Sequence, residues 1–324
     1  MARMQRVAVS LARPFRGFAA SFGSDPRHWQ ILALGGLFLL SFLTSDFGVR
    51  FDSLVFAFGG AFTAQAAGTA CVNWRAGKPL LAGLEWKSAA ITALGITILL
   101  RAADPWIWGA AAFTGIALKF LVRINHKHVF NPGCIGIVAM MLLLGRDAWV
   151  SPGQWGQAPL VAGYAIALAA LTLSSAKRLD IALGFLGGFA AILFARAAWL
   201  GDPVAIPIHQ MSSGALLIFA FFMITDPRST PDSRVGRILF AFAVAGLAAW
   251  FIIGPNQRGA PLIALAALSW LTPAMDLFLP ARRFEWRVGR APTPPLPFQT
   301  LTEPVSPAAG TLHSKTTGDQ RRVA

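Results

Sequence analysis

The chain consists largely of apolar runs separated by short polar connections, and this alternation restricts the folds open to it. Each run approaches the roughly 20 residues that a helix needs to cross the hydrocarbon of a bilayer, although the fifth is short. The sequence therefore predicts an all-α integral membrane protein with about ten transmembrane helices. The predicted spans are 31–48, 53–72, 86–102, 105–122, 132–145, 158–175, 180–200, 208–224, 236–254 and 259–279.

The composition agrees with a membrane protein. Charged residues make up 13% of the 324 residues, whereas a soluble domain carries about 25%. A formal net charge of +14 would suggest nucleic-acid binding in a soluble protein. Here the basic residues lie between apolar runs, so we expect contact with membrane lipid and no nucleic-acid partner. Cys71 and Cys134 lack the spacing of a metal site, and no metal is expected.

The distribution of basic residues predicts the orientation. With the N-terminus inside, 23 of the 28 Lys and Arg residues fall in or beside the inner segments, and the outer connections hold five arginines. Cytoplasmic connections of membrane proteins carry such an excess. We therefore predict a multi-pass protein of the bacterial inner (cytoplasmic) membrane with both termini cytoplasmic.

The two ends of the chain differ in composition from the region between them. Residues 1–29 carry five arginines among phenylalanines, which predicts a basic amphipathic segment on the cytoplasmic membrane face, with an unstructured positive tail as the alternative. Residues 281–324 are rich in Pro, Thr, Ser and Arg, which predicts a disordered cytoplasmic tail. The transmembrane domain is thus predicted to occupy 30–280.

Two proline-marked breaks fall on the predicted cytoplasmic side. Asn131-Pro132 ends one apolar run and begins the next, and Asp226-Pro227 does the same four spans later. Proline disfavours the α conformation in the residue before it and suits the first turn of a helix. Transporter-like folds place their sites at such interruptions in two repeats. Two similar halves, 53–145 and 158–254, are one interpretation, and two unrelated breaks are the other.

Several polar residues beside these breaks are candidates for ligand binding. His126 and His128 flank Lys127 in a short connection, where they could contact a phosphate or quinone headgroup or be solvated interfacial residues. Asp226 can accept backbone hydrogen bonds that the break exposes, while Arg228 and Thr230 supply donors for an anionic group. A helix cap with positive-inside arginines is the alternative explanation.

Other polar and small residues are ambiguous. His209 and Ser213 begin a span on the predicted outer side, where ionisable and polar groups are functional candidates and helix capping is the alternative. Small and hydroxyl residues in the second predicted span, and two Gly-Gly pairs, favour close helix packing over substrate contact. These residues are Thr63, Gln65, Gly68, Thr69 and Asn73, with Gly59-Gly60 and Gly187-Gly188.

Three blocks resemble the membrane-subunit family that includes RnfD of the Rnf complex and NqrB of the sodium-translocating NADH:quinone reductase. Phe130 to Gly136 is similar to the family's FNPxxxG. Ser213 to Pro227 looks like its GA…FFMATDP block, and Gly259 to Asp276 resembles its closing helix with a PxxD ending. The blocks occur in the family's order over about residues 50–280. Motifs of soluble enzymes, such as a phosphate-binding glycine loop or a GxSxG elbow, are missing from the sequence.

The resemblance implies a ten-helix, urea-transporter-like fold and electron transfer through flavin. In the family, FMN is attached to the threonine of an SGAT motif in an outer connection. The corresponding connection here, Gly145 to Ala158, contains no SGAT, and Leu216 follows Ser213-Gly214-Ala215. Ser269 stands where the family usually has Asn. Any FMN or riboflavin is therefore expected to bind non-covalently, and a quinone is the other cofactor considered.

The resemblance favours an electron-transfer subunit that works with redox protein partners or within a larger membrane complex. A small-solute transporter or channel of the same fold, and a scaffold subunit, are the alternatives. No catalytic residue is assigned, and an enzymatic role stays open. The predicted cofactor-binding residues are Asn131, Asp226, Arg228, Thr230, Lys119, Arg123, His128 and Ser213.

Overall fold

The computed structural model describes residues 25–44, 50–125, 127–150 and 178–284. All of them belong to one compact unit. The predicted tail beyond residue 284 and the predicted sixth span, 158–175, lie outside the described residues, as do His126 and most of the N-terminal segment. The first described helix begins at Pro26, inside the predicted N-terminal segment.

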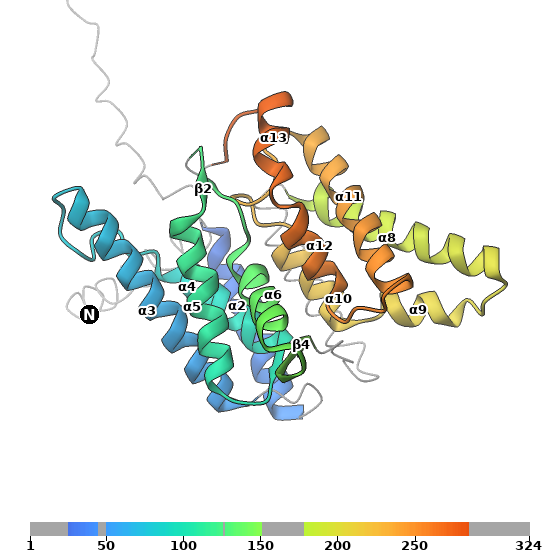
Figure 1. The fold of residues 1–324 in the computed structure, drawn as a ribbon, viewed down its shortest axis with the longest axis horizontal. Helices are drawn as coiled ribbons and strands as arrows, with labels where there is room; N and C mark the ends of the chain where they lie inside the picture. The colour runs from blue at the N-terminus through green and yellow to red at the C-terminus, as the bar shows by residue number, and fades with distance from the viewer. Residues whose placement is uncertain (1–24, 45–49, 126, 151–177, 285–324) are drawn as a thin grey trace, which may run out of the picture. The chain divides into compact units, whose positions relative to one another are not determined.

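The described residues are mostly helical (Figure 1). Two short antiparallel pairs accompany the helices: β1 (Leu100–Ala102) with β4 (Ala148–Val150), and β2 (Arg123–Ile124) with β3 (Lys127–His128). The helices are α2 (Pro26–Thr44), α3 (Phe51–Arg75), α4 (Trp86–Leu99), α5 (Trp106–Leu121), α6 (Pro132–Leu144), the 3₁₀ turn η1 (Gly145–Asp147), α8 (Leu179–Leu200), α9 (Ala205–Met211), α10 (Gly214–Ile218), the π-helix η2 (Phe219–Met223), α11 (Arg234–Ile253), α12 (Ala260–Leu268) and α13 (Leu271–Phe278).

Three described helices are long and apolar enough to cross a membrane: α3, α8 and α11. Two further spans are bent pairs, α9 with α10–η2 at 50° and α12 with α13 at 53°, which gives up to five. These helices confirm the prediction of an all-α membrane protein. They do not confirm the predicted number of ten spans. Helices α4 and α5 are apolar but shorter. Hydropathy alone does not reveal such bends and shortenings.

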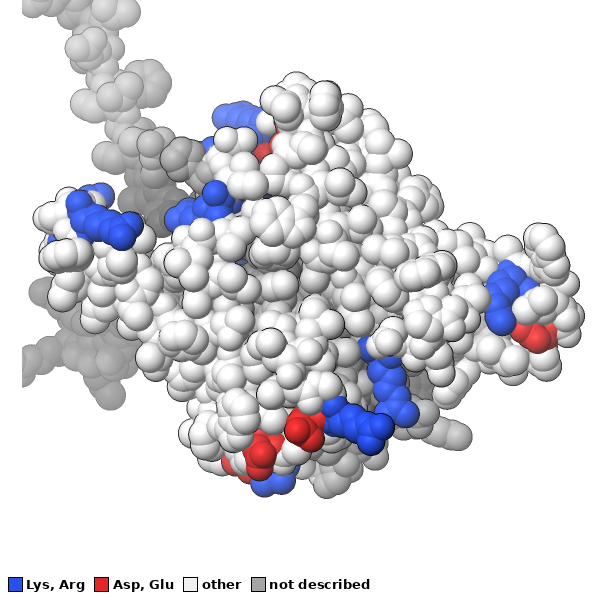
Figure 2. All heavy atoms as spheres, viewed as in Figure 1, with Lys and Arg blue, Asp and Glu red and all other residues white. Residues whose placement is uncertain are grey.

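A wide uncharged surface agrees with a multi-pass membrane protein. Figure 2 shows one face on which Lys, Arg, Asp and Glu form a few separate groups with uncharged residues between them. Large apolar side chains are exposed on several helices, among them Trp199, Leu121 and Phe278. Water would oppose this exposure, whereas lipid is as apolar as these side chains.

Helices α3, α5 and α6 pack closely through small residues. A Cβ added at Gly60 of α3 would collide with the backbone carbonyl of Gly109 in α5. A Cβ at Gly115 of α5 would likewise collide with the carbonyl of Pro132 in α6. Close packing is thereby confirmed at Gly60, and it is also found at Gly188, which lies against Phe242. This packing fixes α6, and hence the first break, against α5.

The Gly59-Gly60 pair provides a matched test of this contact. Gly60→Ala is expected to lower the free energy of unfolding by about 1–3 kcal/mol, because the backbones of α3 and α5 must separate. Gly59→Ala meets no atom within 4 Å and should leave stability unchanged or slightly higher. Thermal unfolding of both variants in one detergent measures the difference. Equal midpoints would show that the close approach is unimportant.

Candidate functional site

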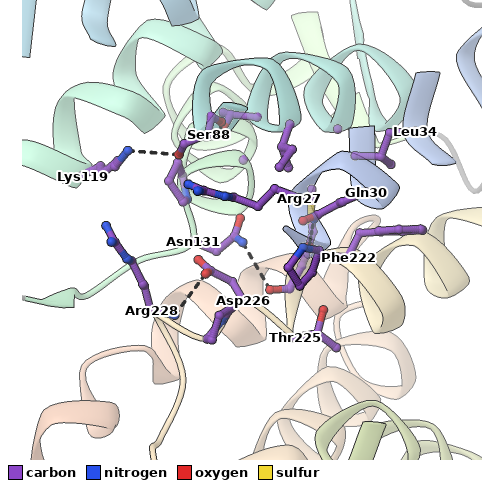
Figure 3. Close-up of a pocket in the computed structure, with 18 of the residues that line it drawn as sticks. Arg27, Gln30, Leu34, Ser88, Lys119, Asn131, Phe222, Thr225, Asp226 and Arg228 are labelled. Carbon is purple, nitrogen blue, oxygen red and sulfur yellow. Dashed lines mark hydrogen bonds between the residues drawn. The ribbon is translucent and has the colours of Figure 1, made fainter. Parts of the chain in front are cut away.

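Asn131 links the two proline-marked breaks. It is the N-cap of α6, with an extended backbone (φ −66°, ψ 123°) that the following Pro132 favours. Its Oδ1 accepts a hydrogen bond from the Cys134 amide at 2.9 Å, which satisfies one of the exposed donors of the helix. Its Nδ2 donates to the carbonyl of Met223 at 3.2 Å, across 92 residues of sequence. One amide therefore caps the first break and holds the second (Figure 3).

The second break is a tight turn organised by Asp226. Its carboxylate accepts hydrogen bonds from the Arg228 amide at 3.1 Å and from Ser229 Oγ at 3.0 Å. Thr230 Oγ1 donates to the Asp226 carbonyl at 2.8 Å. The π-helix η2 precedes this turn, and π-helical turns are frequent at functional sites. Asp226 therefore has the capping role that was considered for it. The turn uses the backbone amide of Arg228, whereas the Arg228 side chain extends towards Glu85.

The start of α2 adds a third element to the site. Asp25 accepts from the Arg27 amide at 3.0 Å and from Lys87 Nζ at 2.8 Å, which ties α2 to α4. Burial would raise the pKa of Asp25, but its hydrogen bonds to Arg27 and Lys87 hold that pKa well below the ordinary value. Gln30 Nε2 donates to the Phe222 carbonyl in η2 at 3.4 Å. Helix α2 thus contacts the segment that leads into the second break.

These three elements enclose a cavity of about 100 Å³, the first cavity. Leu34, Ile91, Ile218 and Phe222 give it an apolar part, and polar groups gather at its other side. Figure 3 shows Asn131 and Asp226 on neighbouring turns, with Arg27 extending from α2 towards Ser88. The polar side chains that line it are Arg27, Gln30, Glu85, Ser88, Thr92, Lys119, His128, Asn131, Thr225, Asp226 and Arg228.

An ionic cluster closes one side of the first cavity. Lys119 of α5 is only 7% exposed, and its Nζ donates to Glu85 Oε2 at 3.0 Å, to Ser88 Oγ at 3.0 Å and to Gln65 Oε1 at 3.2 Å. Arg228 Nη1 lies 3.5 Å from Glu85 Oε1. The Glu85 carboxylate therefore lies between two cations, one from α5 and one from the second break.

A second cavity, of about 240 Å³, lies against the same cluster. Glu85, Lys119, His128 and Arg228 line both cavities, so the cluster separates them. The other polar side chains of the second cavity are Gln65, Thr69, Asn73 and Arg123. Gln65 and Thr69 were expected to serve helix packing, and they hydrogen-bond to each other at 3.2 Å within α3.

His128 lines both cavities beside the cluster, and its proton position is defined. Its Nδ1 is 2.8 Å from the Phe130 carbonyl, which can only accept, so Nδ1 carries a proton. Its Nε2 is 3.9 Å from Asp226 Oδ2. Burial lowers the pKa of His128 below the ordinary 6.5, and the nearby Asp226 carboxylate only partly opposes this effect. The ring is therefore neutral at physiological pH.

His128 is expected to make stability depend on pH. Because its pKa is lower in the folded state, the unfolded chain takes up the proton first as the pH falls through 6.5. The free energy of unfolding should therefore decrease below about pH 7. His128→Asn should reduce this slope in thermal midpoints measured at about pH 7.5 and about pH 5.5. His209→Asn is the matched control, and an equal slope in both variants would contradict the assignment.

The structure brings most of the predicted site residues together. Asn131, Asp226, Arg228, Lys119 and His128 all line the first cavity. Arg123 is exposed and lines the second cavity, not the first. Thr230 is fully buried in the second break and lines neither cavity. Its Oγ1 accepts a hydrogen bond from Arg178 Nη1 at 3.4 Å. Ser213 lies at the opposite end of the α10–η2 segment from Met223 and lines none of the described cavities.

Sequence reasoning missed Arg27, Gln30, Glu85 and Ser88. The sequence did contain a pattern that could have indicated Arg27, because the tripeptide Asp-Pro-Arg occurs at 25–27 and again at 226–228. Both copies begin at a helix boundary, and both arginines line the first cavity. Glu85 and Ser88 carry no comparable pattern, since only the packing of α4 against α5 brings them to Lys119.

Comparison with curated proteins gives relatives in sequence. Three curated proteins, each named as a subunit of an ion-translocating oxidoreductase complex, match the chain. The relative from Alcanivorax borkumensis is 28% identical over 227 residues, which covers 51% of this chain and 65% of the relative. The one from Pseudomonas paraeruginosa is 26% identical, with 62% and 75% covered. The one from Escherichia coli is 32% identical, with 44% and 36% covered.

The match thus spans less than two thirds of the Alcanivorax and Escherichia relatives. The profile of the NQR2, RnfD, RnfE family matches residues 139–284, a region that contains the second break and the closing helices. The first break at Asn131 lies just before this region. The predicted resemblance to the RnfD and NqrB family is confirmed, and residues 139–284, somewhat less than half of the chain, carry the match to the family model.

Proposed function

We propose that the chain is a membrane subunit of an RnfD/NqrB-like electron-transport system and that it passes electrons through a flavin or quinone held in the first cavity. The observation that supports this most is the convergence of both breaks on one cavity, with the Asn131 amide bridging them. The relatives are named as subunits of an ion-translocating oxidoreductase complex. Redox protein partners within a larger membrane complex follow from that name.

The cavity offers a suitable environment for a redox ring. Its apolar residues can contact the ring, and Asn131, Arg27 and Arg228 provide polar groups that can fix the orientation. The protein then supplies binding, orientation and electrostatics, while the cofactor supplies the redox chemistry. Cations beside the ring favour its reduced, more negative form. Lys119 and Arg228 are the cations placed to do this, with Asp226 and Thr230 holding the turn.

The purified protein provides the direct test. Protein in detergent should be yellow, and acid treatment should release the flavin, because no SGAT threonine is present to attach it. Mass measurement of the intact chain shows whether a covalent adduct exists. Colourless protein with no extractable flavin or quinone would overturn the proposal.

We also propose ten spans with both termini in the cytoplasm of a bacterium and both breaks on the inner side of the inner membrane. The distribution of basic residues supports this orientation. Reporter fusions within 123–130 and within 226–234 should report the same face. Opposite faces would contradict the topology, and with it the shared site.

A transporter or channel for a small solute is the second candidate. It is favoured by the two bent helix pairs and by the two cavities that meet at the ionic cluster. Flux of candidate solutes into proteoliposomes would support it. Bound flavin without any solute flux would exclude it.

A further inference from the structure

The end of α3 and the α3–α4 connection (residues 76–85) expose large apolar side chains. Trp74, in the last turn of α3, is 73% exposed, and Leu80 and Leu81 are 55% and 56% exposed. Every residue from Trp74 to Gly83 is exposed. Figure 1 shows this connection at the margin of the described helices. Water would oppose such exposure, so this surface requires an apolar partner.

The α3–α4 connection has a defined shape. Asn73 Nδ2 donates to the carbonyls of Leu80 and Ala82 at 3.0 and 2.9 Å. Gly77 and Gly83 turn the chain with φ of 64° and 70°, values that glycine adopts readily. The backbone between the two glycines is therefore held in place, and its apolar side chains stay at the surface.

The sequence of α3 places this end of the helix at the level of the lipid headgroups. Residues 53–72 carry no charged side chain, and this length is about what a helix needs to cross the hydrocarbon of a bilayer. The exposed ion pair of Arg50 with Asp52 precedes this stretch, and Arg75 follows it. Tryptophan is enriched where hydrocarbon meets water, which is the depth that this reasoning gives to Trp74.

The exposed charges near this end of α3 are all positive. Arg75 and Lys78 are exposed, and within the described part of the chain neither side chain has a hydrogen-bond or ion-pair partner. Glu85 is the first acidic residue after α3, and it pairs with Lys119 and Arg228 instead. Figure 2 shows basic side chains at this end of the molecule with no acidic side chain beside them. The surface therefore combines apolar side chains with two cations that are available to an anion.

The last turns of α3 favour lipid over a soluble protein as the occupant. Ala67, Cys71 and Val72 are exposed on the helix just before Trp74. A phospholipid whose acyl chains lie along these residues brings its headgroup to Arg75. A soluble protein partner would reach the headgroup level but would leave this part of α3 uncovered.

We propose that the end of α3 and the α3–α4 connection bind the headgroup of an anionic phospholipid. Arg75 and Lys78 contact its phosphate, while Trp74, Leu80 and Leu81 lie against the upper part of its acyl chains. The guanidinium of an arginine can bind two phosphate oxygens at once. A basic side chain beside an anionic leaflet contributes about a five-fold preference for it, so the two cations together select an anionic lipid over a zwitterionic one.

Cys71 gives a local measurement of which lipid occupies this surface. It is exposed whereas Cys134 is buried, so a maleimide fluorophore labels Cys71, one turn before Arg75. The labelled full-length chain is placed in phosphatidylcholine nanodiscs that contain equal small fractions of either spin-labelled phosphatidylglycerol or spin-labelled phosphatidylcholine. The anionic lipid should quench the fluorescence at least about two-fold more strongly, and added salt should narrow the difference. Arg75→Gln combined with Lys78→Gln should reduce its quenching to that of phosphatidylcholine.

Arg234→Gln combined with Arg282→Gln is the matched control, because it removes the same charge from exposed positions elsewhere. This pair should keep the preference for phosphatidylglycerol. Thermal midpoints in neutral detergent, without anionic lipid, should equal that of the original protein in both double variants and show that both are folded.

Equal quenching by the two lipids would overturn the proposed lipid site. A preference that survives Arg75→Gln with Lys78→Gln, or one that both double variants lose, would assign it to the net charge of the protein and would also overturn the site. A fluorophore that neither lipid quenches would show that water or a protein partner covers this surface, with the same consequence. None of these results depends on flavin, so the proposed function is tested separately.

Discussion

Replacing Lys127 by methionine is expected to lower the free energy of unfolding by about 3–5 kcal/mol, because the change removes the cation that two largely buried carboxylates share. Lys127 Nζ lies 2.8 Å from Asp276 Oδ2 and 3.2 Å from Asp232 Oδ2, and it donates to the Thr230 carbonyl at 2.9 Å. The side chains of Lys127 and Asp232 are only 12% and 8% exposed. Solvent therefore screens this pair weakly.

The lysine joins three separate parts of the chain. It comes from β3 beside the first break, Asp232 follows the second break, and Asp276 belongs to α13. The Asp232 amide also donates to Asp276 Oδ1 at 2.8 Å, which brings the two carboxylates together. Without the ammonium group these carboxylates repel each other, so we expect the hairpin of β2 and β3 to separate from the second break.

A second substitution distinguishes lost attraction from lost packing. Lys127→Met combined with Asp276→Asn removes one of the opposed charges and should recover part of the stability. Lys78→Met, at an exposed lysine, is the control and should stay within about 0.5 kcal/mol of the original protein. Thermal or denaturant unfolding in detergent measures all three. A midpoint of Lys127→Met equal to that of the control would show that the cluster contributes nothing.

Replacing Asn131 by alanine should have the largest effect on ligand binding, at least about ten-fold in flavin affinity. The change removes the N-cap of α6, at about 1 kcal/mol. It also leaves the Met223 carbonyl without its donor, at about 1–3 kcal/mol. Both breaks are then free to move relative to each other, so the cavity between them loses its shape.

Asn131→Ser separates the two roles. Serine caps a helix about as well as asparagine but is too short to reach Met223. It should recover about 1 kcal/mol of stability relative to alanine while flavin affinity stays low. Flavin titration together with thermal unfolding of both variants measures this difference. Full affinity in Asn131→Ser would show that the contact with Met223 does not shape the site.

The parts of the site that lie next to a proline were predictable, since the local effect of Asn131-Pro132 and Asp226-Pro227 does not depend on the rest of the chain. Lys119 and His128 followed from their closeness to the first break. Burial was not predictable in this way. Thr230 looked like a donor for a ligand, but it is buried and donates to the Asp226 carbonyl.

Residues placed by helix packing were beyond local reasoning. Glu85 reaches Lys119 only because α4 packs beside α5, and Lys127 looked like a solvated residue although it pairs with Asp232 and Asp276. Ser213 was predicted to bind the cofactor but does not lie near the breaks. It is the N-cap of α10, at the opposite end of the α10–η2 segment from Met223. The prediction of ten spans is not confirmed for a similar reason, since bends of 50° and 53° interrupt apolar runs that are continuous in sequence.

The π-helical turn η2 places one extra residue just before the second break. Ile224 N bonds to the Phe219 carbonyl, five residues back, so this turn contains one residue more than an α-helical turn needs. Closing this turn to α-helical geometry would move the extra residue into the loop that follows and rotate the start of that loop by about 100°. Asp226 and Arg228 would then swing away from Asn131 and Glu85 in a single step. An occupant that holds these groups in place would thereby also fix which register the helix adopts.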